Sequence, residues 1–424
     1  MGEGWMETDA DERARRARDA AWSTPLKDFQ VADIEHFHTD THWPWFERLR
    51  LEDPVHYCAD SEYGPYWSIT RFDDIIAVDG NHAVFSSDSE LGGIVIVDSP
   101  EPRRNASFIG LDPPDHDAER KVVTPMFSTA SMANLAPLIR ERAAVILDDL
   151  PIGETFDFVD RVSVELTSQM LATLFDFPFE DRRLLPRASD LMLTTPGPDG
   201  LVATEADRQG EMLNTLTRFV GLWNQRKGAA PRNDLISMLA NADATGGDDP
   251  YAYIGNIVLL IVAGSDTTRH SITGALMAFN DNPLVYDRLR AAPALLESAV
   301  PEIIRWQSPV AHMRRTALAD YQLGDKTIRA GDKVVMWYVS GNRDASAIDT
   351  PEAFIIDRAR PRHHVSFGFG VHRCVGNRLA EMQLRIVWEE MLKRFERIEV
   401  MGAPRRLRSN FVKGYESLPV RLVA

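Results

Sequence analysis

The chain has 424 residues, of which 44% are hydrophobic and 26% are charged, and its formal net charge is −16. This composition is typical of a soluble globular protein with a large core. The negative charge argues against a general binder of nucleic acid or of an anionic membrane. Only two cysteines occur, Cys58 and Cys374, which excludes a disulfide framework and favours a reducing compartment.

The N-terminal sequence "MGEGWMETDADERARRARDAAW" is charged throughout and lacks the apolar stretch of a signal peptide. No window comes near the roughly 18 uninterrupted apolar residues that a membrane span needs. The best candidate, residues 257–263, ends at "GSD" (264–266). We therefore expect a cytoplasmic protein without a membrane span.

The chain is expected to begin with an N-terminal arm or short helix over residues 1–25, followed by one domain over residues 26–424. "VHYCADSEYGPYWSIT" (55–70) predicts a strand, a Gly-Pro turn and a second strand. "KTIRAGDKVVMWYVS" (326–340) has the same pattern, with Ala330-Gly331-Asp332 as the turn. We expect these distant segments to meet in one small sheet.

Most of the remaining chain is predicted to be helical. "SMANLAPLIRERAAVILDDL" (131–150) and "LAEMQLRIVWEEMLKRF" (379–395) carry apolar residues at helical spacing. Residues 251–280 contain no proline and predict one long helix, and "NIVLLIVAG" (256–264) is apolar on all sides, as in a core helix. The segment 191–202 is predicted to be a lid loop. The expected fold class is mainly α with a minor β subdomain.

The stretch "FGFGVHRCVG" (367–376) surrounds Cys374. A free cysteine is most often a small buried hydrophobic residue. Here, however, Gly368 and Gly370 allow backbone shapes that turn N–H groups toward a sulfur. The helix predicted to begin near Gly376 favours a thiolate, and a glycine there leaves room for a flat ligand. These residues therefore predict a thiolate held against a planar ligand.

Two other kinds of site, a metal site formed by histidines and a nucleophilic cysteine, are less well supported. His36, His38 and His42 in "HFHTDTH" have the spacing of metal ligands, but they lie in a charged segment, where a solvated surface stretch is the better interpretation. A Cys-His nucleophile needs an oriented base, and nothing near Cys374 indicates one.

The stretch "FGFGVHRCVG" resembles the haem-binding loop of cytochromes P-450, with Phe367, Gly370, His372, Cys374 and Gly376 at the pattern positions. The resemblance implies the cytochrome P-450 fold and haem b (iron protoporphyrin IX) as cofactor. It also implies that Cys374 is the proximal thiolate ligand of the iron. An axial thiolate pushes electron density onto iron and favours O–O cleavage.

The segment "AGSDTT" (263–268) lies in the middle of the long predicted helix. A glycine there costs about 1 kcal/mol relative to alanine, and a buried carboxylate is costly unless it is paired. A satisfied polar cluster in the core is one interpretation. In the other, Gly264 lets a cofactor or O₂ approach, and Thr267 or Thr268 bonds a carbonyl one turn back and distorts the helix.

This segment also resembles the oxygen-activation motif of the cytochrome P-450 family. By that resemblance Thr267 assists oxygen activation, and Asp266 connects the site to a proton relay. Arg269 and His270 are candidate partners of the Asp266 carboxylate.

The resemblance extends to a scaffold triad. "EIIR" places Glu302 and Arg305 on one helix face, and "FIIDR" later supplies Arg358. Alone, such a pair is most often an exposed ion pair of little worth. The order matches the family's Glu-Arg-Arg triad, so these residues are assigned a structural role.

The propionates of a haem need cationic or N–H partners. "LDPPDHDAER" (111–120) places His116 and Arg120 on one face of a short helix, as in the family. Taken singly, each such residue is as well explained as a surface cation. The resemblance adds Arg315 (or its neighbour Arg314), His364 (or its neighbour His363) and His372 as further propionate contacts.

The substrate pocket is expected to have apolar walls beside the long helix, which suits an apolar small molecule. The candidate wall residues are Leu91, Ile94, Ile96, Phe108, Ile109, Val262, Ala263, Val310, Ala311, Met313, Phe411 and Val412.

Four longer stretches narrow the resemblance, namely "AGSDTTRHSITGALMAFNDNP", "VVMWYVSGNRD", "HRCVGNRLAEMQLRIVWEEMLKRF" and "FVKGYESLPVRL". They look like the soluble bacterial branch that hydroxylates medium-chain alkanes and fatty acids at the terminal carbon. This implies an oxidoreductase that inserts one oxygen of O₂ into an unactivated C–H bond. The alternatives are a monooxygenase of another apolar substrate such as a terpenoid, a peroxide-driven peroxygenase, and a non-catalytic haem-thiolate sensor.

Electrons are expected from a partner, because the chain has no GxGxxG dinucleotide fingerprint and is too short for a fused reductase. The implied partner is a 2Fe–2S ferredoxin with an NAD(P)H-dependent ferredoxin reductase. Arg373 and Arg378, with Arg120 and Lys121, predict a basic patch that suits an acidic ferredoxin. Ordinary solvated charge is the alternative.

Overall fold

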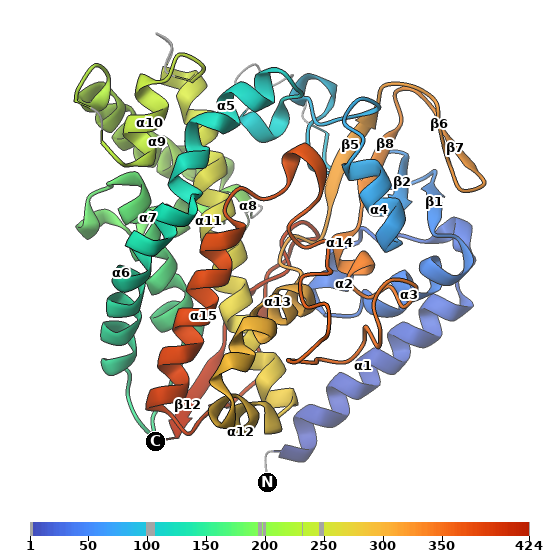
Figure 1. Ribbon diagram of the computed structural model, residues 1–424. Coiled ribbons are helices and arrows are strands. Elements are labelled where there is room, and N and C mark those ends of the chain that lie inside the picture. The colour runs from blue at the N-terminus through green and yellow to red at the C-terminus, as the bar shows by residue number, and fades with distance from the viewer. Residues whose placement is uncertain are drawn as a thin grey trace.

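The computed structural model of the chain describes residues 3–98, 107–193, 197, 201–230, 232–245 and 250–423. Helices fill one side of the molecule and most strands gather on the other, as Figure 1 shows. The helices are α1 (Glu3–Ser23), α2 (Ile34–His38), α3 (Trp43–Glu52), α4 (Phe72–Asp79), α5 (Asp115–Val123), α6 (Thr129–Asp148), α7 (Glu165–Phe175), α8 (Leu184–Leu193), α9 (Glu205–Arg226), α10 (Leu235–Asn241), α11 (Pro250–Asp281), α12 (Leu284–Ala291), α13 (Leu296–Gln307), α14 (Tyr338–Gly341) and α15 (Asn377–Arg394).

The strands form small sheets, which confirms the predicted mainly α fold with a minor β part. One sheet has the order β1-β2-β8-β5-β3, and smaller sheets pair β4-β12-β9, β6-β7 and β10-β11. The strands are β1 (Val55–Cys58), β2 (Tyr66–Ile69), β3 (Phe85–Ser86), β4 (Thr155–Asp157), β5 (Met313–Ala317), β6 (Tyr321–Leu323), β7 (Lys326–Ile328), β8 (Lys333–Met336), β9 (Arg397–Val400), β10 (Arg405–Arg406), β11 (Tyr415–Ser417) and β12 (Pro419–Val423).

The predicted β segments meet in part. The segment 55–70 forms the antiparallel pair β1-β2, with Val55 opposite Ile69. Strand β8 joins the same sheet, parallel to β2. Strand β7, predicted beside it, pairs instead with β6 in a separate two-stranded sheet. The turn at 330–332 therefore links two sheets, because β8 is already flanked by β2 and β5.

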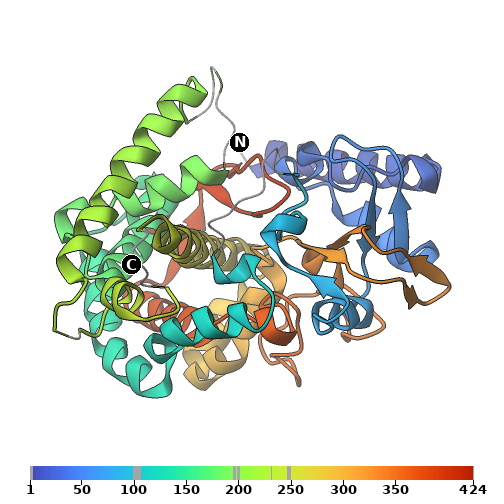
Figure 2. The same ribbon diagram turned by 90° about the horizontal axis from the view of Figure 1, so that it is seen from above.

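The long helix α11 contains the predicted helix 251–280 and crosses the helical part of the molecule (Figures 1 and 2). Its neighbours include α7, α8, α13 and α15. Ile257, Ile261 and Ile272 on α11 are buried in one core cluster with residues of these neighbours. Helices α6 and α15 confirm the two other predicted amphipathic helices and pack against each other.

The N-terminal residues form a helix of 21 residues, α1, that lies along α3. Arg18 of α1 donates to Glu47 of α3 at 2.6 Å, and Ala21 is fully buried. The predicted lid loop at 191–202 lies largely outside the described residues, and its first residues complete α8. No single helix in the described ranges is both long and apolar enough to cross a membrane, although a pair bent by 48°, Asp115–Phe127 with Thr129–Asp148, meets that test by length and composition alone.

Candidate functional site

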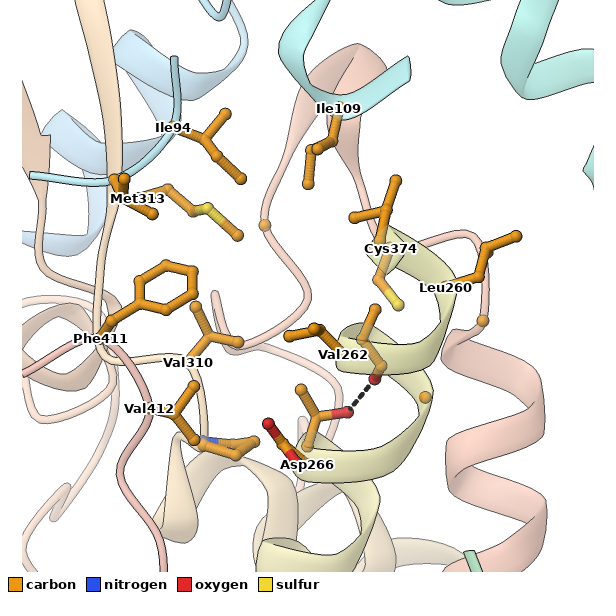
Figure 3. Close-up of a pocket in the computed structure, with 18 of the residues that line it drawn as sticks. Ile94, Ile109, Leu260, Val262, Asp266, Val310, Met313, Cys374, Phe411 and Val412 are labelled. Atoms are coloured by element: carbon orange, nitrogen blue, oxygen red, sulfur yellow. Dashed lines mark hydrogen bonds between the residues drawn. The ribbon is translucent and has the colours of Figure 1, made fainter. Parts of the chain in front are cut away.

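A cavity of about 1030 Å³ lies beside α11 and reaches the loop that carries Cys374. In Figure 3, Val262 and Asp266 lie on α11, while Ile94, Met313 and Phe411 lie on the opposite side of the cavity. The α11 helix and the Cys374 loop thus provide two of its walls.

The Cys374 loop is shaped by its glycines. Gly368 and Gly370 both have φ near +67°, the left-handed region that side-chain-bearing residues rarely adopt. A Cβ at Gly370 would lie 2.6 Å from the carbonyl oxygen of Asp79, so no larger residue fits there. The Cys374 N–H donates to the Phe367 carbonyl at 2.8 Å and closes the loop. Helix α15 begins at Asn377, one residue later than the predicted start near Gly376.

Cys374 lines the cavity and is exposed to the open space there. Burial raises the pKa of this thiol, while the Gly376 N–H and the charges of Arg120 and Arg373 oppose that rise. The second cysteine, Cys58, is buried in β1 and does not line the cavity. Of the two cysteines, Cys374 is therefore the one whose position suits an iron ligand.

Asp79 anchors the loop from behind, a role that no sequence pattern indicated. Its Oδ2 accepts from the Phe369 N–H at 2.7 Å and from the Tyr338 hydroxyl at 2.8 Å. Its Oδ1 accepts from Arg315 at 2.6 Å. One buried carboxylate at the end of α4 thus connects the Cys374 loop to a cation in the cavity wall.

The candidate propionate contacts His116, Arg120, Arg315 and His372 gather around this loop. The rings of His116 and His372 lie 4.3 Å apart, and Arg120 donates to the carbonyl of Arg373. Arg120, Arg315 and His372 line the cavity. His116 keeps its Nδ1 on Asp117 at 2.7 Å, which orients the ring.

These residues fit a haem with propionate groups. The Nε2 atom of His116 and both ring nitrogens of His372 are buried and have no hydrogen-bond partner in the described structure. Orphaned buried nitrogens are costly, so they indicate a polar group that belongs beside them. A Cβ at Gly376 would meet only the Phe127 ring, at 3.7 Å, which leaves the space above the thiol open to a flat ligand.

The two neighbouring arginines that were candidates for the same propionate contact differ in position. Arg315 lines the cavity, whereas Arg314 does not and pairs with Asp98 at 2.5 Å. His364, the predicted propionate contact, is not among the residues that line the cavity. Its Nδ1 accepts from the Ser366 N–H at 3.3 Å, and its ring lies against Phe367 behind the loop. The alternative residue, His363, stacks on Phe72 and is also outside the cavity lining.

Asp266 lies at the centre of a buried polar network. Its Oδ1 is 2.8 Å from Arg269, and its Oδ2 accepts from Ser189 of α8 at 2.9 Å. Burial raises the pKa of Asp266 to about 6, and the Asp190 charge adds to the rise while Arg269 opposes it. Arg269 also pairs with Asp190, whose side chain is 28% exposed. The network therefore runs from the cavity wall to the surface at α8.

His270, the other candidate partner of Asp266, is not part of this network. Its Nδ1 accepts from the Tyr415 N–H at 3.2 Å, and a Cβ at Gly414 would lie only 2.4 Å from the ring. The side chain is fully enclosed by the C-terminal segment.

Thr267 faces the cavity, and its Oγ1 donates to the Ala263 carbonyl at 2.7 Å, as the helix-distortion interpretation predicted. Gly264 lies in the cavity lining and also has a packing role. A Cβ there would lie 2.8 Å from Leu171 of α7, so the missing side chain serves the close packing of α7 on α11.

Most of the residues predicted for the substrate wall line this cavity. They are Ile94, Phe108, Ile109, Val262, Ala263, Val310, Met313, Phe411 and Val412.

Leu91, Ile96 and Ala311 do not line the cavity. Leu91 is 45% exposed and its carbonyl accepts from Thr316. Ile96 and Ala311 are buried in a second core cluster, away from the cavity. In each segment a neighbouring residue lines the cavity instead. Successive side chains of a loop point in different directions, so only some of them can face the cavity.

Sequence reasoning missed the α7 and α8 walls. Met170, Leu171 and Leu174 of α7 and Met192 and Leu193 of α8 line the cavity. These residues belong to ordinary amphipathic helices, so no local signal distinguishes them from core.

The three residues of the predicted scaffold triad lie in one buried cluster. Glu302 and Arg305 are fully buried and form two hydrogen bonds, at 2.7 and 2.8 Å. Arg358 donates to the same carboxylate at 3.0 and 3.2 Å. Arg305 also holds the carbonyls of Asn342 and Pro351 at 2.8 Å, which ties α13 to the segment before the Cys374 loop.

The N-terminal histidines make other contacts. His42 stacks on Phe37 at 4.6 Å and His36 on Trp45 at 4.8 Å. Within the described ranges there is no group of three or more His, Cys, Asp or Glu side chains that could hold a metal ion.

A cavity-facing cysteine at the start of a helix, with orphaned imidazoles and cations around it, is the arrangement expected of a haem-thiolate enzyme. Residues 153–411 match the family model described as Cytochrome P450. Among curated proteins, linalool 8-monooxygenase of Pseudomonas putida is 38% identical over 393 residues, which cover 89% of this chain and 95% of that protein. The chain belongs to the cytochrome P450 family and is a haem-dependent monooxygenase.

Solved structures agree with this assignment. Cytochrome P450-153 from Novosphingobium aromaticivorans has a TM-score of 0.86 and 41% identity, and the match covers 93% of this chain and 99% of that chain. CYP153D17 from Sphingomonas sp. PAMC 26605 has a TM-score of 0.87 and 40% identity, with 94% and 100% covered.

Proposed function

We propose that this monooxygenase hydroxylates the terminal carbon of medium-chain alkanes or fatty acids. The observation that carries the proposal is the cavity beside Cys374, whose described walls away from the loop are mostly aliphatic and aromatic side chains. Such walls suit a hydrocarbon chain. The likeness to the two P450-153 structures and the resemblance in "AGSDTTRHSITGALMAFNDNP" support the same substrate class.

Cys374 is the residue we assign as the iron ligand, and His116, Arg120, Arg315 and His372 as the groups that hold the propionates. When bound, the haem supplies the activation of O₂ at its iron. The protein's part is to keep the thiolate in place through the Cys374 loop, and to meet the propionates with the Arg315 guanidinium that Asp79 orients and the His116 imidazole that Asp117 orients.

Asp266 and Thr267 are assigned to proton delivery. Thr267 presents its hydroxyl on the cavity side of α11, and Asp266 lies buried next to it in sequence. With its pKa near 6, Asp266 is a carboxylate that can take and release a proton close to neutral pH. The Arg269 contact connects this carboxylate to Asp190 of α8, whose side chain is partly exposed, and Ser189 donates to it from the same helix.

A terminal methyl has the strongest C–H bonds of an alkane, so it reacts only if it is placed at the iron. The apolar walls would place it there by confining the chain. Met313, Val310 and Phe411 face α11 across the cavity (Figure 3). We assign these three side chains to confining the chain beside Val262.

A 2Fe–2S ferredoxin with its NAD(P)H-dependent reductase is the electron donor we propose. Lys121, Arg373 and Arg378 are exposed, and α5 is joined to the Cys374 loop by the contact between Arg120 and the Arg373 carbonyl. These cations lie on segments next to the thiolate and would attract an acidic partner to the side where electrons must enter.

A terpenoid is the second candidate substrate class. It is favoured by one specific observation, the 38% identity to linalool 8-monooxygenase over 89% of this chain.

The decisive experiment supplies the purified haem-loaded protein with a ferredoxin, its reductase and NADH, and offers octane, dodecanoic acid and linalool in separate reactions. Products are identified by gas chromatography and mass spectrometry. We expect 1-octanol or 12-hydroxydodecanoic acid as the main product. Hydroxylation only away from the chain end, or only of linalool, would overturn the proposal.

A further inference from the structure

The opening of the cavity carries charged side chains as well as apolar ones. Glu62 and Arg408 line the cavity and are exposed, so they lie where it meets solvent. Ile34, Tyr63 and Asn410 line the same region and are less exposed. A substrate that enters here passes these groups before it reaches the walls described above.

The cation at this opening is already paired. Arg408 Nη1 lies 2.9 Å from Glu35 Oε2, and the two side chains are 64% and 51% exposed. An exposed pair of this kind contributes little to stability, but it cancels the charge of Arg408 locally. Glu62 remains as a further carboxylate at the opening.

The surroundings of Tyr63 show which charged side chains lie near the opening. Its hydroxyl accepts from Asn410 at 3.1 Å. Burial is the main cause that raises the pKa of this phenol, a hydrogen bond with Glu62 and the charges of Glu62 and Asp33 raise it further, and the Asn410 contact opposes the rise. The charged groups described near Tyr63 are thus the carboxylates of Glu62 and Asp33 and the ammonium of Lys333, which binds the Tyr63 carbonyl and is held by Asp98 at 2.8 Å.

We propose that Glu35, Glu62 and Arg408 form a charge filter at the cavity opening, which admits uncharged chains and disfavours chains with a carboxylate. This rests on the proposed function and deepens it, because it selects the neutral members among the two substrate classes. A chain whose methyl end is placed at the iron leaves its other end toward the opening, and a carboxylate there would meet Glu62 and an arginine already held by Glu35.

The test compares dodecanamide with dodecanoate, two ligands of equal chain length that differ in head-group charge. Binding to the haem-loaded protein is measured by titration calorimetry at pH 8 and low ionic strength, without turnover. The amide is expected to bind about fivefold more tightly, the effect of about one unscreened contact between like charges in water. Salt at about 0.5 M should narrow the difference, because exposed charges are screened over a few ångströms.

Substitutions at the opening test whether these carboxylates cause the difference in affinity between the two ligands. The double variant E35Q/E62Q frees Arg408 and removes both carboxylates, so dodecanoate should bind about fivefold more tightly while dodecanamide is unchanged. E416Q is the matched control: Glu416 pairs with the exposed Arg405 at 2.7 Å and does not line the cavity. This variant should change the affinity for neither ligand.

Equal or tighter binding of dodecanoate by the unaltered protein would overturn the filter, and so would a double variant that leaves dodecanoate unchanged. Binding of neither ligand would overturn the filter, and the proposed function would be overturned with it only if octane were not hydroxylated at its terminal carbon. A confirmed filter with products hydroxylated away from the chain end would overturn the proposed function alone.

Discussion

Asp266 Oδ1 lies 2.8 Å from the guanidinium of Arg269, one turn further along α11, and neither side chain is more than 5% exposed. A buried carboxylate in the middle of a core helix is tolerated because this cation and the hydroxyl of Ser189 share its charge. The same contacts place a titratable group next to Thr267 at the wall of the cavity.

Stability should record the titration of Asp266. Its pKa is raised from 3.8 to about 6 on folding, so the folded protein holds this proton more tightly than the unfolded chain. The associated stability is present at low pH and is lost as pH rises through 6. Between pH 5 and 7.5 the protein should lose about 1 kcal/mol relative to D266N, which cannot titrate there. Urea unfolding of both proteins at each pH measures this difference, and parallel pH profiles would contradict the assignment.

Thr267→Ala should leave haem binding intact and divert electrons from product to hydrogen peroxide. The hydroxyl bonded to Ala263 would be lost, and with it the last group of the proton path. We expect the fraction of NADH that yields product to fall about tenfold, at the low end for loss of a positioned acid–base group. T267S keeps the hydroxyl and serves as control. Unchanged coupling in T267A would remove Thr267 from proton delivery.

Cys374→Ser should abolish the red-shifted absorption band of the ferrous–CO complex, because that band requires a thiolate ligand. C58S is the control, since Cys58 lies buried in β1 and outside the cavity lining. The absorption spectra of both variants after reduction and CO addition decide the matter. A surviving band in C374S would exclude Cys374 as ligand.

Glu302→Gln should destabilise the fold strongly, because Arg305 and Arg358 would lose their common carboxylate inside the protein. Breaking a buried pair typically costs about 3–5 kcal/mol. Asp357→Asn breaks an exposed pair with Arg288, whose side chains are 46% and 48% exposed, and should cost less than about 1 kcal/mol. Urea unfolding of the haem-loaded proteins gives both values, and similar costs would argue against a structural role for the triad.

Phe411→Ala should loosen the end-on placement of a chain, since it removes a ring from the cavity wall opposite α11. With octane, the share of 2-octanol and 3-octanol should rise at the expense of 1-octanol. Leu91→Ala is the control because Leu91 is exposed and outside the lining. A product ratio that is the same in both variants would show that Phe411 does not confine the chain.

Local patterns in the sequence were sufficient for much of the architecture. The apolar run and the absence of proline at 251–280 predicted α11, and the glycines around Cys374 predicted the loop that the structure contains. The pairing of Glu302 with Arg305 needs only their spacing on one helix. The division into an arm at 1–25 and a domain at 26–424 stays a prediction.

Other features depend on which distant segments meet, and no local pattern carries that information. Asp79 holds the Cys374 loop although some 290 residues separate them, and Lys413 is buried with its ammonium 4.7 Å from the ring of Trp43. The placement of His364 behind the loop and of Ala311 in a second core follows from the same packing.

The sequence alone was enough to identify the cofactor and the chemistry, because a thiolate loop and an acid–alcohol pair are each contained in a few consecutive residues. The shape and charge of the substrate cavity were visible only in the folded protein. They arise where α2, α7, α8, α11 and the C-terminal segment converge, and side chains from such separate elements become neighbours only when packing brings them together.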